Sequence, residues 1–198
     1  QVRDIRDFMM DNHVFYEAQN MDEITNSYNK LLNDSDNKTA KDLSLDLMKV
    51  FSKYRQGHVS VNTVYNGKPS VFINEINGKY YIVATTDKYK NLLGTEVIGI
   101  NNIKMKDIID RLEAYAIGEN ESFRNLTRKS FLNYYEILKK ENVLTEEQNI
   151  YELKIGDKIV KLDLPFEKSK EFIVSKLKIN GRKTELINVK QKNDNKDK

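Results

Sequence analysis

The stretch from Tyr80 to Leu112 constrains the fold most, because strand, turn and helix patterns follow one another there without a gap. Residues 96–100 are short, apolar and β-branched, as in a buried strand. Gly94 follows two leucines, where the backbone needs a residue that tolerates positive φ. From Met105, apolar residues recur at helical spacing as far as Ala116. The stretch therefore predicts strands packed against a one-sided helix.

Apolar residues at helical spacing predict three helices before Gly57. The first covers residues 2–12, and the second, 20–33, opens with an Asn-x-x-Glu pair that resembles a capping box. The third carries an apolar stripe over 43–54 and ends with Gly57 at the position after the C-cap. We expect residues 1–57 to form a small helical subdomain.

Strand patterns begin directly afterwards. Residues 58–64 alternate and are β-branched, which predicts a strand. Residues 70–76 and 80–86 flank Asn77-Gly78, the strongest hairpin signal in the chain. Further on, 151–155 and 159–164 form a second hairpin pattern. The predicted class is α+β, with a β-sandwich or barrel and flanking helices.

Three further predictions concern the later part of the chain. Asn120 and Glu121 start a long helix, and its inward residues are Phe123, Leu126, Phe131, Tyr134 and Leu138. Residues 166–189 are expected to form one or two strands, with a turn at Asn180-Gly181. Residues 190–198 contain no apolar side chain and are expected to be disordered.

Composition excludes several classes of function. The 33 basic and 30 acidic residues are interleaved, which argues against a nucleic-acid partner. The absence of cysteine excludes disulfides and thiolate metal sites, and two histidines argue against a metal site built from them, so no cofactor or metal is expected. No apolar run reaches the ~18–20 residues of a membrane span. The first residue is Gln1 rather than Met, which is compatible with a removed signal peptide or anchor.

The sharpest chemical candidate is His58, in the sequence RQGHVS at 55–60. An imidazole at the mouth of a strand is held firmly and still reaches solvent, so it could serve as a general base. The alternative is a histidine that is merely exposed or hydrogen-bonded at a strand end. His13 reads as a packing or capping residue. No serine lies in a glycine-flanked turn that would offer an oxyanion hole, so the chain lacks a complete active site of its own.

A peptide groove is the second candidate. An exposed strand at 80–86 beside the helix from Met105 could accept an extended peptide through main-chain hydrogen bonds. The candidate peptide-binding residues come from both elements: Tyr80, Tyr81, Ile82, Val83, Lys106 and Ile109. The alternative is that the strand is paired on both sides and the helix only covers the core.

The order strand, short helix, GTEVIGINN strand and turn, then helix resembles the second half of a PDZ-like domain. Together with NHVFY at 12–16, RQGHVSV at 55–61, NGKYYIV at 77–83 and IYELKIGDKIVKLDLP at 150–165, it resembles the front part of the C-terminal processing (tail-specific, tricorn-like) serine peptidases of bacteria. The resemblance covers about residues 1–165. The PDZ carboxylate-binding Gly-apolar-Gly loop is missing before Tyr80, where Asn77-Gly78 stands instead, which argues against capture of a free C-terminus.

The resemblance implies a division into a helical subdomain at 1–57, a PDZ-like domain at 58–165 and a connector and tail at 166–198. His58 matches the histidine that serves tricorn-like members as base, whereas other members use a serine–lysine dyad. The nucleophilic serine belongs to a catalytic domain without a counterpart here.

The implied function is therefore the non-catalytic, substrate-recognition and regulatory portion of a serine endopeptidase, secreted or in the cell envelope. Its partners would be a protein or peptide substrate and its own C-terminal catalytic domain; the sequence sets no oligomeric state. Two alternatives remain open: a stand-alone peptide- or protein-binding scaffold, and a lid or spacer that binds no peptide.

Overall fold

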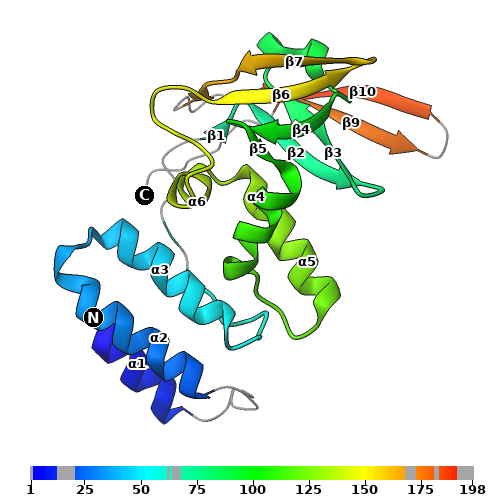
Figure 1. Cartoon of the computed structure of the whole chain (residues 1–198). Helices are drawn as coiled ribbons and strands as arrows, with labels where there is room; N and C mark the ends of the chain where they lie inside the picture. Colours follow the sequence, from blue (N-terminus) through cyan, green and yellow to red (C-terminus); the bar gives the residue numbers. More distant parts are fainter. Residues whose placement is uncertain are drawn as a thin grey trace. The chain divides into compact units, whose positions relative to one another are not determined.

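The computed structural model describes residues 2–12, 21–61, 63, 68–167, 173–180 and 183–190 (Figure 1). The predictions for His13 and for the tail beyond Lys190 lie outside these residues. The chain divides into two compact units: unit 1 comprises 1–64 and 112–128, and unit 2 comprises 65–111 and 129–198. The domain borders expected at residues 57 and 165 stay a prediction.

Unit 1 is helical in its described residues. The three helices predicted before Gly57 are present as α1 (Val2–Asp11), α2 (Met21–Asp34) and α3 (Ala40–Ser52), with the short turn η2 (Ser35–Asn37) between the last two. Later in the chain, unit 1 adds the turn η4 (Glu113–Tyr115) and the first part of α5 (Glu121–Ser130). Thr39 caps α3 because its side chain accepts the N–H of Asp42 at 3.1 Å. Ile24, Tyr28 and Leu47 lie in the apolar core that the first three helices share.

The strand predicted at 58–64 is wrong for the residues that the structure describes there. Residues 59–61 and 63 belong to no strand, and His58 lies in a turn. The β-branched pattern has a different cause, because Val59 is buried in the helical core and Val61 packs against it. Burial against helices, rather than pairing with a neighbouring strand, explains the alternation.

Unit 2 is an antiparallel sheet with helices. Its strands are β1 (Lys68–Pro69), β2 (Val71–Ile76), β3 (Lys79–Thr85), β4 (Glu96–Ile100), β5 (Ile103–Lys104), β6 (Ile150–Ile155), β7 (Lys158–Asp163), β8 (Phe166–Glu167), β9 (Ile173–Asn180) and β10 (Lys183–Lys190). The main sheet runs β10-β9-β3-β4-β6-β7, with β2 on β3 and β5 on β4, while β1 pairs with β8. Its helical segments are η3 (Asp87–Leu92), α4 (Met105–Leu112), η5 (Phe131–Asn133) and α6 (Tyr135–Lys140). The α+β class is confirmed.

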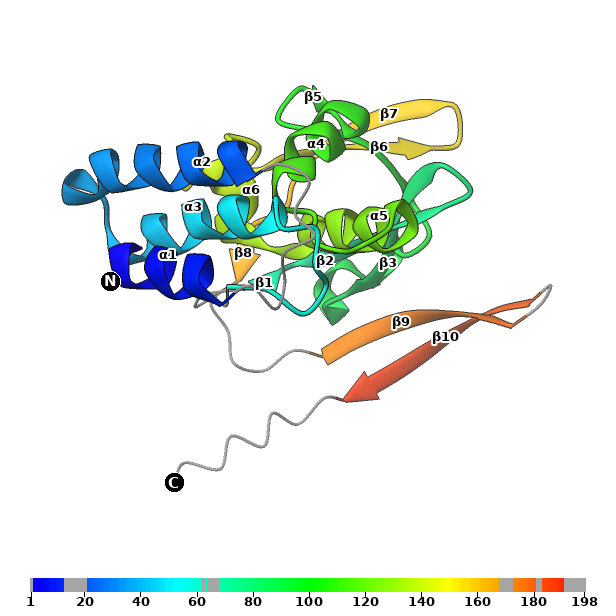
Figure 2. The ribbon, with the colours of Figure 1, turned by 90° about the horizontal axis from the view of Figure 1, so that it is seen from below.

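Two asparagine turns set the register of this sheet. Asn77 and Gly78 have φ of 52° and 77°, and they join β2 to β3 as the hairpin signal predicts. Asn101 and Asn102, with φ of 50° and 62°, join β4 to β5. Figure 2 shows β9 and β10 as a long two-stranded ribbon; β9 pairs with β3 at only two positions, Ala84 and Thr85.

The long helix predicted after Asn120 is wrong in its length. The chain forms α5, the turn η5 and the separate helix α6. Phe123 and Leu126 are 38% and 65% exposed, so they do not face inward as predicted. The break falls at η5, where Phe131 and Leu132 are buried and the side chain of Asn133 bonds to a strand.

The helix predicted from Met105 is present as α4, and its predicted inner residues Met105, Ile108, Ile109 and Leu112 are buried. Among the helices of the described residues, none combines the length and the apolar character that a membrane span requires.

Candidate functional site

The side chain of His58 is exposed, and the turn that carries it is not built as predicted. Helix α3 ends at Ser52, five residues before Gly57, and the residue with left-handed backbone is Arg55, with φ of 52°. Gly57 has no positive φ. The prediction that Gly57 directly follows the C-cap of the third helix is therefore wrong, because the C-cap is Lys53.

Gly57 is needed for a close approach instead. A Cβ atom at Gly57 would lie 2.8 Å from Cε1 of Phe123, and one at Gly118 would lie 2.4 Å from Cδ1 of the same ring. Gly118 also has φ of 132°, a conformation that L side chains rarely adopt. The two glycines thus allow one aromatic ring to pack against both the His58 turn and the segment before α5.

The side chain of Glu119 also holds the turn that carries His58. Its Oε1 accepts the N–H of Gly57 at 2.7 Å, within unit 1. This hydrogen bond is the main cause that holds the pKa of Glu119 below its ordinary value, and the nearby charge of His58 acts in the same direction. The carboxylate of Glu119 thus fixes the main chain directly before His58.

Arg124 is the centre of a buried polar network that supports this turn. Its guanidinium donates to the carbonyl of Ala116 at 2.6 Å, to that of Ser52 at 3.3 Å and to Oε1 of Glu113 at 2.6 Å. Arg128 donates to the other oxygen of Glu113 at 2.7 Å. Burial raises the pKa of Glu113, but the two guanidiniums outweigh it and hold the pKa below its ordinary value. The network ties the end of α3 to the segment that carries Glu119.

The predicted peptide-binding strand has no free edge. One edge of β3 pairs with β2 along its length. On the other edge, Tyr80 and Tyr81 pair with β4, the N–H and C=O of Ile82 bond to Thr95 and Gly94, and Ala84 and Thr85 pair with β9. Of the two alternatives for this strand, the structure shows the one in which both edges are paired, because the main-chain groups of β3 are already used by neighbouring strands.

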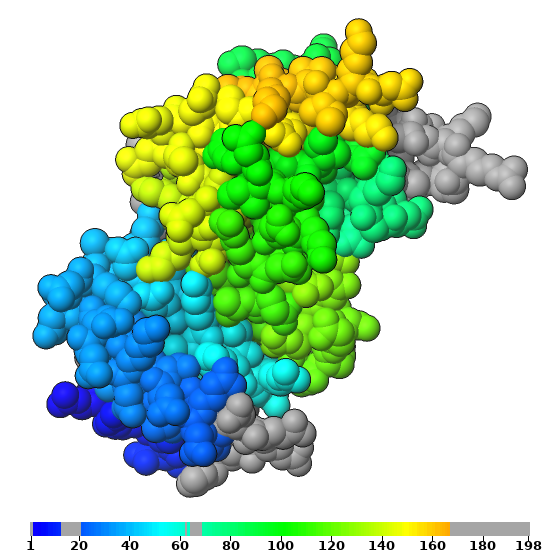
Figure 3. All heavy atoms as spheres, viewed as in Figure 1, coloured from blue at the N-terminus to red at the C-terminus, as the bar shows by residue number. Residues whose placement is uncertain are grey.

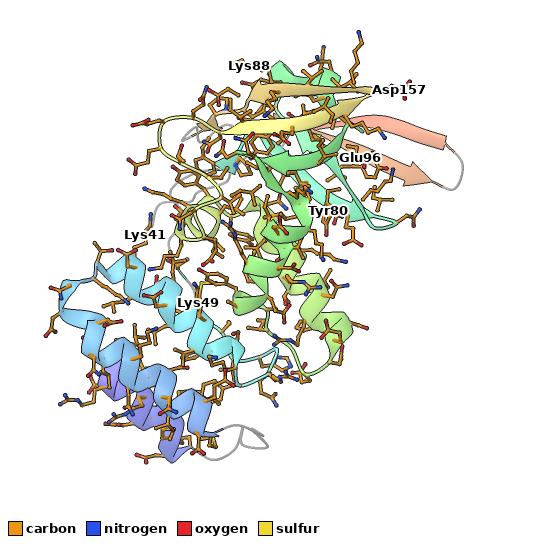
Figure 4. All side chains as sticks on the ribbon, viewed as in Figure 1. Lys41, Lys49, Tyr80, Lys88, Glu96 and Asp157 are labelled. Atoms are coloured by element: carbon orange, nitrogen blue, oxygen red, sulfur yellow. The ribbon has the colours of Figure 1, made fainter. Side chains whose placement is uncertain are left out.

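The other predicted binding residues are dispersed by the fold. Ile82 and Ile109 are buried in the core, whereas Lys106 is exposed on α4 and Val83 is half-buried. Tyr80 lies on β3 opposite Glu75 of β2, and its hydrogen bond helps to lower the pKa of that carboxyl (Figure 4). The structure thus gives Tyr80 an internal partner. Roles of these side chains in binding stay a prediction.

The outer edges of the sheet differ from β3 and from each other. At β2, the side-chain amide of Asn133 accepts the N–H of Ile73 at 2.8 Å and donates to its C=O at 3.1 Å, so it occupies that edge as a strand would. At the opposite end, β7 pairs with β6 and with no other strand of the described residues. Within the part of the chain that the structure describes, the outer edge of β7 therefore has main-chain groups that pair with no strand.

Sequence reasoning missed Glu119, Arg124 and Asn133. None of them stands in a pattern of its own, because each acts on main-chain groups that are distant along the chain. No group of His, Asp and Glu side chains in the described residues could hold a metal ion.

The chain is similar to a known protein in its fold. No protein-family model matches the chain, and no curated protein matches it. The fold is similar to that of mature CPAF complexed with lactacystin, with a TM-score of 0.53 and 8% sequence identity. The match covers 72% of this chain and 29% of the CPAF chain, so the chain spans less than a third of that neighbour.

Proposed function

We propose that this chain is the non-catalytic, substrate-recognition and regulatory portion of a bacterial serine endopeptidase of the C-terminal processing kind, which acts in the cell envelope or outside the cell. The observation that carries the proposal is the fold likeness to CPAF, which takes in 72% of this chain but only 29% of the CPAF chain. The order of the motifs at 55–61, 77–83 and 92–102 supports the same assignment. The PDZ-like character of residues 58–165 belongs to this proposal.

In this function His58 is the general base for a serine supplied by a C-terminal catalytic domain. Its exposure leaves the imidazole accessible, and the Gly57–Glu119 hydrogen bond holds its turn. In that role the imidazole would take the proton of the serine hydroxyl as the serine attacks the substrate. Recognition of substrate then falls to surfaces other than β3, whose edges are occupied.

The test is peptide binding by the purified 198-residue chain, with free-acid and amidated peptides of a library compared side by side. We expect binding without hydrolysis. Dependence on the free carboxylate would assign recognition of substrate C-termini, and indifference to it would assign recognition of internal segments. Serine-type hydrolysis by the pure chain, or the absence of any peptide binding, would contradict the proposal.

The role of His58 is tested where a serine-containing catalytic domain follows in the same reading frame. In that longer protein, His58→Ala should lower kcat by about 10²–10⁴-fold while peptide affinity is unchanged. Hydrolysis that survives the substitution would place the base elsewhere, as in the serine–lysine members.

A second candidate is a stand-alone peptide- or protein-binding scaffold. The free edge of β7 favours it, because strand addition there needs no catalytic domain. The gene separates the two functions: a frame that continues past the codon for Lys198 into a glycine-rich segment with a serine supports the peptidase portion, and a stop codon supports the scaffold.

A further inference from the structure

Strand β7 is an edge strand with an unusual set of exposed side chains. Ile159 is 62% and Val160 39% exposed, and Ile155 at the end of β6 is 48% exposed. Lys158 and Lys161 flank the two apolar residues and are also exposed. Figure 3 shows this part of the chain, in yellow-orange, at the surface of unit 2, and Figure 4 marks the hairpin tip at Asp157.

Because successive side chains of a strand point to opposite faces, the two lysines and the two apolar residues of β7 are divided equally between its faces. Lys158 and Val160 lie on one face, and Ile159 and Lys161 lie on the other. Each face of the edge therefore offers one apolar side chain beside one lysine. A neighbouring strand would fit best if two adjacent apolar residues stood opposite Ile159 and Val160, with acidic residues on either side.

The two lysines are not equivalent. Nζ of Lys161 lies 2.9 Å from Oε1 of Glu152 and donates to Asn102 at 2.7 Å. Lys158 forms no ion pair with the residues that the structure describes. Lys158 is thus the cation that a partner carboxylate can reach without displacing an existing contact.

Lysines on an edge strand commonly deter unwanted pairing. Here that explanation is incomplete, because a purely protective edge would not expose Ile159 and Val160 between the lysines. The edge of β2 shows the contrast, since Asn133 closes it against Ile73. The β7 edge combines unpaired main chain, apolar surface and available positive charge.

We propose that the β7 edge binds, by strand addition, an extended segment of a protein substrate in which two adjacent apolar residues are flanked by acidic residues. The inference rests on the proposed peptide-recognition function and names its binding surface and substrate class. A second copy of this chain fits less well. Two-fold antiparallel pairing centred on Val160 sets Val160 against itself, but it sets Lys158 against Leu162 and Ile159 against Lys161, so neither lysine meets a carboxylate.

The first experiment measures the affinity of the whole chain for a labelled peptide with the central sequence Glu-Ile-Val-Glu and for its counterpart Lys-Ile-Val-Lys. The acidic peptide should bind more tightly. Lys158→Glu should weaken the binding of the acidic peptide by about fivefold, because opposite cross-strand charges become like charges. The same substitution should strengthen the binding of the basic peptide, because like charges become opposite. Lys90→Glu, an exposed lysine on η3 with the same change of net charge, should alter neither affinity. Equal effects of the two variants would overturn the proposal.

The second experiment tests the main-chain pairing with peptides that are N-methylated at alternate positions. Because successive N–H groups of a paired strand point to opposite sides, methylation in one register should abolish binding and methylation in the other should leave it unchanged. Equal loss in both registers, or in neither, would show that no strand is added.

The outcomes separate this inference from the proposed function. If library peptides bind but the Glu-Ile-Val-Glu peptide does not compete with them, the β7 assignment fails and the proposed function stands. If no peptide binds at all, both fail. If sedimentation velocity shows self-association and Ile159→Lys abolishes it, the β7 edge binds a second copy of this chain, and the proposal is overturned.

Discussion

The turn that carries His58 and the hairpin β6–β7 are held in place by different kinds of interaction. The turn depends on side chains from residues far along the chain: Glu119 binds the N–H of Gly57, and Arg124 binds the carbonyl of Ser52. The hairpin depends on its own main chain, which pairs from Ile150 opposite Asp163 to Ile155 opposite Lys158. One region needs particular residues, and the other needs a strand pattern and a turn.

Single substitutions should therefore have different effects on the stability of the two regions. A hairpin residue is replaced without loss of its main-chain hydrogen bonds, whereas a side chain that binds several main-chain groups leaves them all unpaired when it is removed. Sensitivity to substitution should therefore concentrate in unit 1, around Arg124 and the glycines beside Phe123.

The largest effect is expected from Arg124→Met. The substitution removes the guanidinium and leaves one oxygen of Glu113 and the carbonyls of Ser52 and Ala116 without their donor, which should cost about 4 kcal/mol of unfolding free energy. Urea unfolding followed by far-UV circular dichroism measures it. Arg111→Met is the matched control, because Arg111 is exposed and donates to one carbonyl, that of Glu141. Equal midpoints for the two variants would show that the network does not hold unit 1.

The next effect is expected from Gly118→Ala. The new Cβ would meet the ring of Phe123 at 2.4 Å, and φ of 132° is strained for alanine, so the cost should be about 3 kcal/mol. Gly78→Ala has positive φ but open space around the Cβ, and should cost about 1 kcal/mol.

The combination of Gly118→Ala with Phe123→Ala isolates the contact. Removal of the ring should recover the part of the loss that comes from the clash and leave the backbone strain. If the double variant recovers nothing, the ring does not pack where the structure places it.

The same contrast explains which parts of the fold could be predicted from the sequence. The hairpin at Asn77-Gly78, strand β4 and the buried face of α4 were predictable because each is specified by residues adjacent in sequence or one helical turn apart. The α+β class follows from them.

The candidate site was predictable only in part. His58 stood out by residue type, but the reasons for Gly57 and Gly118 lie in Phe123, a contact that no local pattern reports. Strand β3 resembled an open groove wall because pairing on both edges comes from β2, β4 and β9, and sequence does not show which strands are neighbours. Val59 and Val61 resembled strand residues because a helical core buries β-branched side chains equally well.

A smaller effect is expected at the edge of β2. Asn133→Ala removes the side chain that satisfies both main-chain groups of Ile73, at a cost of about 1.5 kcal/mol. Amide hydrogen exchange should show lost protection at Ile73 beyond the change in global stability. Asn74→Ala, which removes only a bond to the adjacent Glu75, is the control. Unchanged exchange at Ile73 would mean that Asn133 does not close the edge, and β2 and β7 would then be alike.

The smallest predicted effect is the pH dependence of the unfolding free energy, which one carboxyl group of each unit is expected to cause. Hydrogen bonding with Lys129 is the main cause that holds the pKa of Glu75 below its ordinary value of 4.5, with burial opposing it. A carboxyl whose pKa is lower in the folded state adds stability above its unfolded pKa and loses it as pH falls through the folded value. Unfolding free energy should therefore decline as pH drops below about 4.5.

Glu75→Gln should remove part of that decline, by less than about 1 kcal/mol because the pair is partly exposed. Lys129→Met should raise the pKa of Glu75 in an NMR titration, since it removes the main cause of the shift.

Both carboxyl groups of the comparison, Glu75 in unit 2 and Glu113 in unit 1, have lowered pKa values, so acid should weaken both units. Glu113 has two arginine partners and Glu75 one lysine, so Glu113→Gln should flatten the decline more. If Glu75→Gln flattens it more than Glu113→Gln does, the charged network of unit 1 is not the more important one.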